Sequence, residues 1–128
     1  MRTIQTMTLV LLAGIGIGAA AVQTLQAQAK PPVYTVTEID VSNIEAYVKD
    51  YAPLAQATIK TSGGKLLAAG QKVTALEGDP PKPRVTIQMW ESLEAAQKWR
   101  SSPEYKKARE VGDKYAKFRA YAIEGLPQ

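Results

Sequence analysis

The chain has 128 residues, no cysteine and no histidine, and 16 basic against 12 acidic residues, for a net charge of +4 at neutral pH. This length fits one domain with a modest core. Without thiols or imidazoles the sequence excludes disulfides, a Ser-His-Asp triad and the usual zinc, copper and haem ligands. Its dispersed basic residues argue against nucleic-acid binding. We expect no cofactor and no metal site, although carboxylates alone can hold calcium or magnesium.

The N-terminal segment has the pattern of a secretory signal peptide. Arg2 supplies a positive charge, residues 7–22 (MTLVLLAGIGIGAAAV) are apolar and uncharged, and an A-x-A step ends at Ala29. The apolar run is shorter than the roughly 20 residues that span a bilayer. We expect cleavage after Ala29 or Ala27, leaving residues 30–128 as an exported domain, periplasmic or secreted, with no stable membrane span. An uncleaved N-terminal anchor is the alternative.

The first strand and the first helix follow the leader. Residues 33–41 (VYTVTEIDV) are rich in β-branched residues with two alternating sets, which predicts a strand. Asp40 or Ser42 is expected to cap a helix whose apolar residues recur at helical spacing over residues 44–59. Pro53 removes a backbone donor inside this helix, so we expect a kink or a restart there.

A hairpin is expected next. Gly63 suits the left-handed position that ends a helix. Residues 65–78 contain the second strand, in which Gly70 indicates a bulge or a bend. Residues 78–83 (GDPPKP) form a rigid turn, and residues 84–90 (RVTIQMW) alternate and predict the third strand.

The second helical region starts at Glu91 or Ser92 and contains a second start signal. Within residues 99–109 (WRSSPEYKKAR), Ser102 at the N-cap precedes Pro103 at the first helical position. A nucleophilic serine would need a base, and the nearby lysines stand in no recognised arrangement with it. We therefore interpret this serine as a cap.

A last strand over residues 118–125 completes the order βαββαβ. This is the ferredoxin-like, α+β arrangement, with a four-stranded antiparallel sheet and both helices on one face. The other face also carries apolar residues and needs a cover. We expect a homodimer that packs sheet against sheet.

Aromatic side chains with polar tips fall at the predicted helix–sheet boundaries. They are interpretable as core or interface, or as the walls of a small-molecule pocket between helices and sheet. Arg84 lies at a strand end, and Arg109 follows an apolar helix position, so both are candidates to orient a carboxylate. The candidate ligand-binding residues are Tyr34, Tyr47, Tyr51, Arg84, Trp90, Trp99, Tyr105 and Arg109.

A cofactor-independent enzyme is the second hypothesis. Asp40 and Glu91 are its candidate general bases, with Tyr47 or Tyr105 as a proton donor. Such a carboxylate should be buried, with a raised pKa. A structural or interaction module that offers its dimer surface to another envelope protein is the third hypothesis.

Short motifs over residues 33–125 together resemble a known family. They are Asp40, Tyr47, the GGK of 63–65, Gly70, the LEG of 76–78, Arg84, the ES-EAA--W of 91–99, the SPEY of 102–105 and the EG of 124–125. The combination resembles the domain of unknown function 1330 family, in the dimeric α/β-barrel superfamily. Lys65, where arginine is common, and the secretory leader depart from the family pattern.

The resemblance implies a ferredoxin-like protomer and a two-fold dimer, and it brings no assigned reaction. The superfamily includes cofactor-free monooxygenases, isomerases and decarboxylases, which raises the expectation of a small-molecule pocket only slightly. We therefore expect an exported dimeric domain that binds a small aromatic or carboxylate-bearing molecule between its helices and its sheet. We expect no nucleic acid among its partners.

Overall fold

The computed structural model describes residues 30–127, of which Pro32–Leu126 form one compact unit. The predicted signal peptide, residues 1–29, lies outside the described residues. No helix in the described part of the chain is long and apolar enough to cross a membrane.

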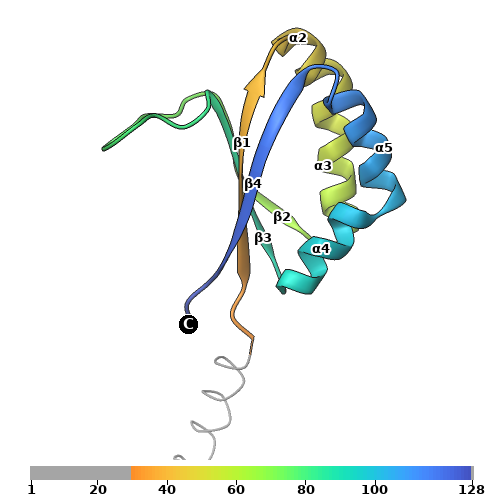
Figure 1. Ribbon diagram of the computed structural model, residues 1–128. Helices are drawn as coiled ribbons and strands as arrows, with labels where there is room; N and C mark the ends of the chain where they lie inside the picture. Colours follow the sequence, from red (N-terminus) through yellow and green to blue (C-terminus); the bar gives the residue numbers. More distant parts are fainter. Residues whose placement is uncertain (1–29, 128) are drawn as a thin grey trace, which may run out of the picture. The chain divides into compact units, whose positions relative to one another are not determined.

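The elements follow the predicted order, with each helical region divided. They are β1 (Val33–Val41), α2 (Ile44–Ala46), the π-helical turn η1 (Tyr47–Tyr51), α3 (Ala52–Thr61), β2 (Lys65–Gly70), β3 (Arg84–Trp90), α4 (Leu93–Ser101), α5 (Pro103–Gly112) and β4 (Ala116–Glu124). The strands form one four-stranded antiparallel sheet in the order β2-β3-β1-β4. The helices all lie on one side of it (Figure 1). The ferredoxin-like α+β fold is confirmed.

The strand register assigns each side chain to a face of the sheet. Thr37 pairs with Thr86, and both line a cavity under the helices. One residue earlier, Val36 pairs with Ile87 and with Tyr121. Because successive side chains alternate between faces, this second row lies on the face that no helix of the described chain covers.

The second strand is shorter than predicted. It ends at Gly70, and the bulge lies between Leu66 and Ala68 instead of at the glycine. Residues 71–83 form a loop that extends away from the sheet on the side opposite to the helices (Figure 1). The backbone N–H of Lys82 donates to Glu38 Oε1 at 3.1 Å, which ties the returning end of this loop to β1.

The first helical region restarts ahead of Pro53, as predicted. The Ala52 N–H bonds to the Tyr47 carbonyl, five residues back, and Pro53 falls in the first turn of α3, where its missing N–H is tolerated. The cap is Asn43, whose Oδ1 accepts from the Ala46 N–H at 3.1 Å. The expectation of Asp40 or Ser42 was wrong, because the Ser42 hydroxyl donates to the Tyr115 carbonyl at 3.0 Å instead.

The core fills the space between the helices and the sheet. Trp90 and Ile39 are its most deeply buried large side chains. At the end of α3, Gly63 has φ +88°, the left-handed conformation that was predicted. The next residue, Gly64, lets the chain approach the indole closely, since a Cβ there would lie 2.6 Å from the Trp90 ring. This close approach places β2 directly against the core.

Ser102 separates α4 from α5 and serves both. Its extended backbone (φ −66°, ψ 145°) breaks the helix. Its Oγ accepts from the Tyr105 N–H at 3.2 Å and donates to the Trp99 carbonyl at 2.7 Å. One hydroxyl therefore satisfies an end group of each helix. The cap interpretation is confirmed, and Ser92 caps α4 in the same way.

Replacing Ser102 with alanine should lower the free energy of unfolding by about 1 kcal/mol, because both helix ends lose a partner. Urea unfolding of the variant measures this. Ser101→Ala is the matched control, since that exposed hydroxyl donates only to the Gln97 carbonyl, and its effect should stay under about 0.5 kcal/mol. Equal losses for the two variants would contradict the double-capping role.

Candidate functional site

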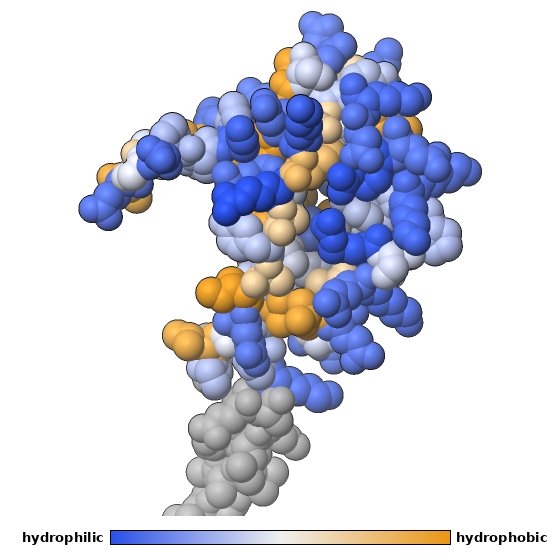
Figure 2. Space-filling view, viewed as in Figure 1, coloured by the Kyte–Doolittle hydropathy of each residue, from blue (hydrophilic) through white to orange (hydrophobic). Residues whose placement is uncertain are grey.

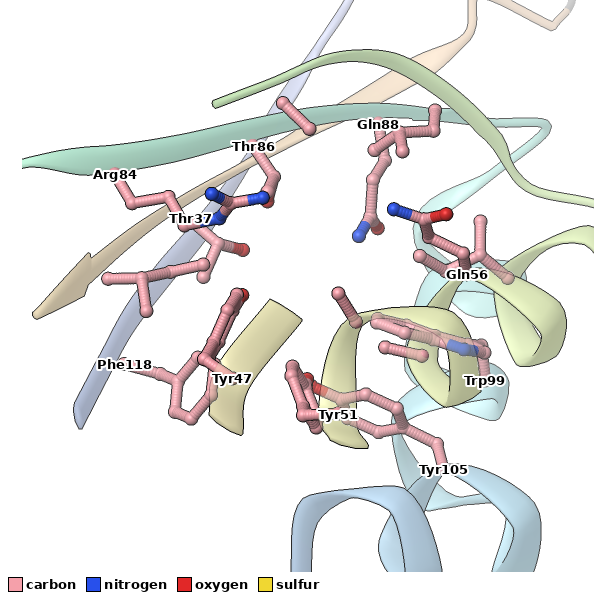
Figure 3. Close-up of a pocket in the computed structure, with 16 residues that line it drawn as sticks. Thr37, Tyr47, Tyr51, Gln56, Arg84, Thr86, Gln88, Trp99, Tyr105 and Phe118 are labelled. Atoms are coloured by element: carbon pink, nitrogen blue, oxygen red, sulfur yellow. The ribbon is translucent and has the colours of Figure 1, made fainter. Parts of the chain in front are cut away.

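A cavity lies between the covered face of the sheet and the helices. About 40 Å³ of it can hold the centre of a water-sized sphere, and the space between its atoms, open solvent at the mouth included, is about 480 Å³. Every strand contributes lining residues, as do η1, α3, α4 and α5. Figure 3 shows polar groups of β3 at the sheet side and aromatic rings at the helix side, around an open centre.

Arg84 is a cation without an acidic partner at the sheet side of the cavity. Within residues 30–127, the ion pairs are Arg109–Asp113 and Arg119–Glu38. The Nε of Arg84 is buried and has no hydrogen-bond partner. Its guanidinium carbon lies 5.0 Å from the centroid of the Tyr47 ring, within cation–π range. A buried donor without an acceptor costs free energy, so this guanidinium favours a ligand that supplies one.

Gln88 presents a second donor to the same space. Its Oε1 accepts from Thr35 Oγ1 at 3.0 Å and from the Trp90 indole N–H at 3.0 Å. Because an indole nitrogen can only donate, this contact settles which end of the amide is oxygen. The Nε2 group is therefore left for the cavity, and it points toward the open centre (Figure 3).

The hydroxyls of two buried tyrosines stay protonated at neutral pH. Burial raises the pKa of Tyr47, and the nearby Arg84 guanidinium opposes this only in part. Burial also raises the pKa of Tyr51, and the neighbouring Tyr105 adds to the effect. The hydroxyl oxygens of Tyr51 and Tyr105 lie 3.4 Å apart. Both tyrosines with raised pKa values therefore act as neutral hydrogen-bonding groups and not as bases.

Aromatic rings in tilted contact close the helix side of the cavity. The ring centroids of Trp99 and Tyr105 lie 4.0 Å apart, and those of Trp99 and Trp90 lie 5.2 Å apart. The Trp99 indole N–H donates to Thr58 Oγ1 at 2.9 Å, which fixes the ring. Trp99 lines the cavity, whereas Trp90 lies behind it in the core.

The structure brings together part of the set of residues expected to bind a ligand. The residues of that set that line the cavity are Tyr47, Tyr51, Arg84, Trp99 and Tyr105. Trp90 supports the wall from behind. Arg109 contacts Tyr105 from outside the cavity, its Nη1 donating to the phenol oxygen at 3.2 Å. Tyr34 lies on the other face, in register with Met89 and Ile123.

Neither candidate base meets its condition. Asp40 and Glu91 are both exposed and do not line the cavity. Each stands where a strand meets a turn, and there the carboxylate remains in water. A buried carboxylate at either position is thus contradicted, and neither residue is retained as a general base.

The sequence interpretation missed Gln88, Gln56 and the threonines of the cavity. A signal was present in β3, where Arg84, Thr86 and Gln88 occupy alternate positions with Trp90. Alternation places these side chains on the same face as the indole. A polar row that ends in a buried tryptophan indicates a polar patch inside the fold. No group of three or more acidic residues in the described chain is placed to hold a metal ion.

Comparison with known proteins agrees with this fold. Among solved structures, a protein of unknown function from Rhodopseudomonas palustris shares 19% identity over 81% of this chain and 92% of its own, with a TM-score of 0.63. SnoaB, a cofactor-independent oxygenase from Streptomyces nogalater, shares 12% identity over 77% of this chain and 96% of its own, with a TM-score of 0.58. A putative antibiotic biosynthesis monooxygenase from Nitrosomonas europaea shares 15% identity over 76% and 92%, also at 0.58.

These neighbours are dimeric α/β-barrel proteins, and at such identities the likeness establishes the fold alone. No curated protein matches the chain. The model of the family described as Domain of unknown function (DUF1330) matches residues 32–126, nearly the whole of the described chain. This protein therefore belongs to the domain of unknown function 1330 family.

Proposed function

We propose that the protein binds a small organic acid in the cavity, with the carboxylate held by Arg84 and Gln88. The observation that carries this proposal is the buried, unpartnered Nε of Arg84 in a cavity that contains no acidic side chain. A carboxylate supplies both the missing acceptor and the missing negative charge.

The chemistry of the two donors favours a carboxylate over a neutral acceptor. A guanidinium matches the two oxygens of a carboxylate with parallel N–H groups. Gln88 Nε2 adds a donor from the same strand face, and its orientation is locked by Thr35 and Trp90. The Nε of Arg84, which has no acceptor within the described chain, would remain unsatisfied beside a hydrocarbon.

The rings opposite favour a flat, apolar body on the ligand. Trp99, Tyr105 and Tyr51 line the helix side and leave a narrow space between themselves and β3. Aromatic walls with a few convergent polar groups are typical of small-molecule sites. An aromatic carboxylate combines the charge that the sheet side lacks with the flat surface that the helix side accepts.

A second candidate function is cofactor-independent oxygenation, as in the neighbour SnoaB. Arg84, Gln88 and the protonated tyrosines supply donors that stabilise a developing oxyanion. The described residues that line the cavity include no carboxylate and no histidine to remove a proton. Such an enzyme would need a substrate that ionises readily by itself, and dioxygen uptake with a polyphenol would favour this function over simple binding.

The proposal also includes export and a homodimer. Export is supported by the pattern of residues 1–29 in the sequence. Dimerisation is supported by the row Val36, Ile87 and Tyr121 on the uncovered face of the sheet and by the dimeric architecture of the neighbours. Apolar surface also follows β4, as Figure 2 shows in orange and tan.

Arg84→Gln tests the binding proposal. Isothermal titration should show that benzoate binds the purified protein and that the neutral isostere benzamide binds far more weakly. The variant should raise the Kd for benzoate by about 10- to 100-fold, the value of a charged hydrogen bond. Arg100→Gln removes the same charge from the exposed surface of α4 and should leave the Kd unchanged. Equal binding of benzoate and benzamide would contradict the proposal.

Ile87→Glu tests the dimer. A buried charge between two sheets is strongly unfavourable, so light scattering should show the wild type near twice the protomer mass and the variant near the protomer mass. Gln97→Glu, an equivalent change on the exposed surface of α4, should remain dimeric. A monomeric wild type at micromolar concentration would exclude this interface.

The raised pKa of Tyr51 predicts a dependence of stability on alkaline pH. Its pKa in the folded state exceeds the ordinary 10.0, so the folded state keeps a proton that the unfolded state loses. The resulting stability is complete below about pH 10 and is lost as the pH rises further. Between about pH 9 and about pH 11, urea unfolding should show a steeper loss for wild type than for Tyr51→Phe. Equal slopes for wild type and Tyr51→Phe would contradict the assignment.

A further inference from the structure

A chain of hydrogen bonds leads from the protein surface to the helix side of the cavity. Asp113 Oδ1 accepts from Arg109 Nε at 3.0 Å and from Nη2 at 2.9 Å. Arg109 Nη1 donates to the Tyr105 phenol oxygen at 3.2 Å. The Tyr105 and Tyr51 oxygens lie 3.4 Å apart, and both rings line the cavity. The proposed carboxylate site at Arg84 and Gln88 does not use any of these groups, although they border the same cavity.

The chemistry of the arginine gives this chain a direction. A guanidinium can only donate, so the Tyr105 oxygen must accept from it. A hydroxyl that accepts from a charged donor becomes a stronger donor itself. The 3.4 Å contact allows either tyrosine to donate, and the charged donor on Tyr105 favours the direction in which the Tyr105 hydrogen points to the Tyr51 oxygen. The hydrogen of Tyr51 is then free to point into the cavity.

The surroundings of Tyr51 hold its ring in place. A Cβ on Gly112 would lie 2.6 Å from this ring, so α5 packs directly against it. The ring centroids of Phe118 and Tyr47 lie 5.6 Å and 5.1 Å from that of Tyr51. The guanidinium of Arg109 lies 3.9 Å from the Phe118 centroid, which fixes the arginine on the outer side. A donor held this firmly can select the position of a ligand atom.

We propose that Tyr51 is a second donor that contacts the ligand. Its hydroxyl donates a hydrogen bond to a carbonyl oxygen at the end of the ligand opposite the carboxylate. Figure 3 places Arg84 and Gln88 on the sheet side of the open centre, and Tyr51 and Tyr105 on the helix side. The ligand class is thus an aromatic acid that carries a keto or aldehyde oxygen. This inference rests on the proposed function and deepens it.

Arg109 and Asp113 are positioning residues in this account, because they reach the ligand only through Tyr105. The carboxylate of Asp113 is 60% exposed, so the ion pair by itself adds little to stability. The hydrogen bonds to Tyr105 and Asp113 outweigh burial and hold the pKa of Arg109 above its ordinary value, so the side chain stays charged. Its effect should therefore appear in ligand preference more than in folding.

The test compares two pairs of ligands of nearly equal shape, 3- and 4-acetylbenzoate against 3- and 4-ethylbenzoate, by isothermal titration with the full chain. In wild type, at least one acetyl compound should bind about three- to tenfold more tightly than its ethyl counterpart, the effect of one neutral hydrogen bond. Tyr51→Phe should abolish this preference, because it weakens binding of the acetyl compound more than binding of the ethyl compound.

Arg109→Gln gives a second variant that leaves the cavity wall intact. It should reduce the preference for the acetyl compound, and Arg109→Lys, which keeps a charged donor, should restore part of it. Arg84→Gln should weaken both members of a pair equally. If acetyl and ethyl compounds bind wild type with equal affinity, the role of Tyr51 is overturned while the carboxylate site stands. If neither compound binds wild type, both proposals are overturned.

Discussion

A guanidinium held against aromatic rings, with no carboxylate beside it, is the constraint on which this site depends. Proteins pair or hydrate such a charge when they bury it. In the described chain the ion pairs are formed by Arg109 with Asp113 and by Arg119 with Glu38. The positive charge of Arg84 therefore has no carboxylate partner within the described chain. The free energy cost of the unpartnered Nε is modest, and a bound carboxylate removes it. The proposed site is thus prepared for one charge type by the protein alone.

The surrounding fold makes that preparation rigid. Gln88 is fixed through its oxygen by Thr35 and Trp90, and Trp90 is fixed by the close approach of Gly64. On the helix side, the π-helical turn before Pro53 keeps Tyr47 and Tyr51 buried toward the sheet. Local sequence features, such as a proline and a glycine, therefore determine the shape of the proposed site through the packing of specific rings. In the proposed site, recognition would follow from preorganised donors and would require no reactive side chain.

Much of the fold was predictable because its signals are local. Ser102 and Pro103 mark a helix start, Pro53 forces a restart, and alternation shows the strands. The type of the turn at Tyr47–Tyr51 was not predictable, since any widened or kinked turn would accommodate the proline. The cap of the first helix is Asn43 and not Asp40 or Ser42, because the Ser42 hydroxyl bonds to the carbonyl of Tyr115, far along the chain.

The site was predictable only in part, for a different reason. Alternation shows which residues of a strand share a face, but both faces of this sheet carry apolar residues. Nothing local distinguishes Trp99, which lines the cavity, from Trp90, which lies behind it, because their depth depends on how α4 packs on the sheet. Asp40 and Glu91 were candidate general bases because they are acids at predicted strand ends. Whether their carboxylates are exposed depends on how the chain turns there, which these residues alone do not determine.

The most direct test of the central claim observes Arg84 itself. Titration of isotope-labelled protein with benzoate, followed through the side-chain Nε–H signals of the arginines, reports which guanidinium receives the carboxylate. The proposed carboxylate site predicts a saturable shift of the Arg84 signal toward the position of a hydrogen-bonded N–H, with the signals of Arg100 and Arg119 unchanged. Saturable binding that leaves the Arg84 signal in place, or that moves another arginine instead, would contradict it.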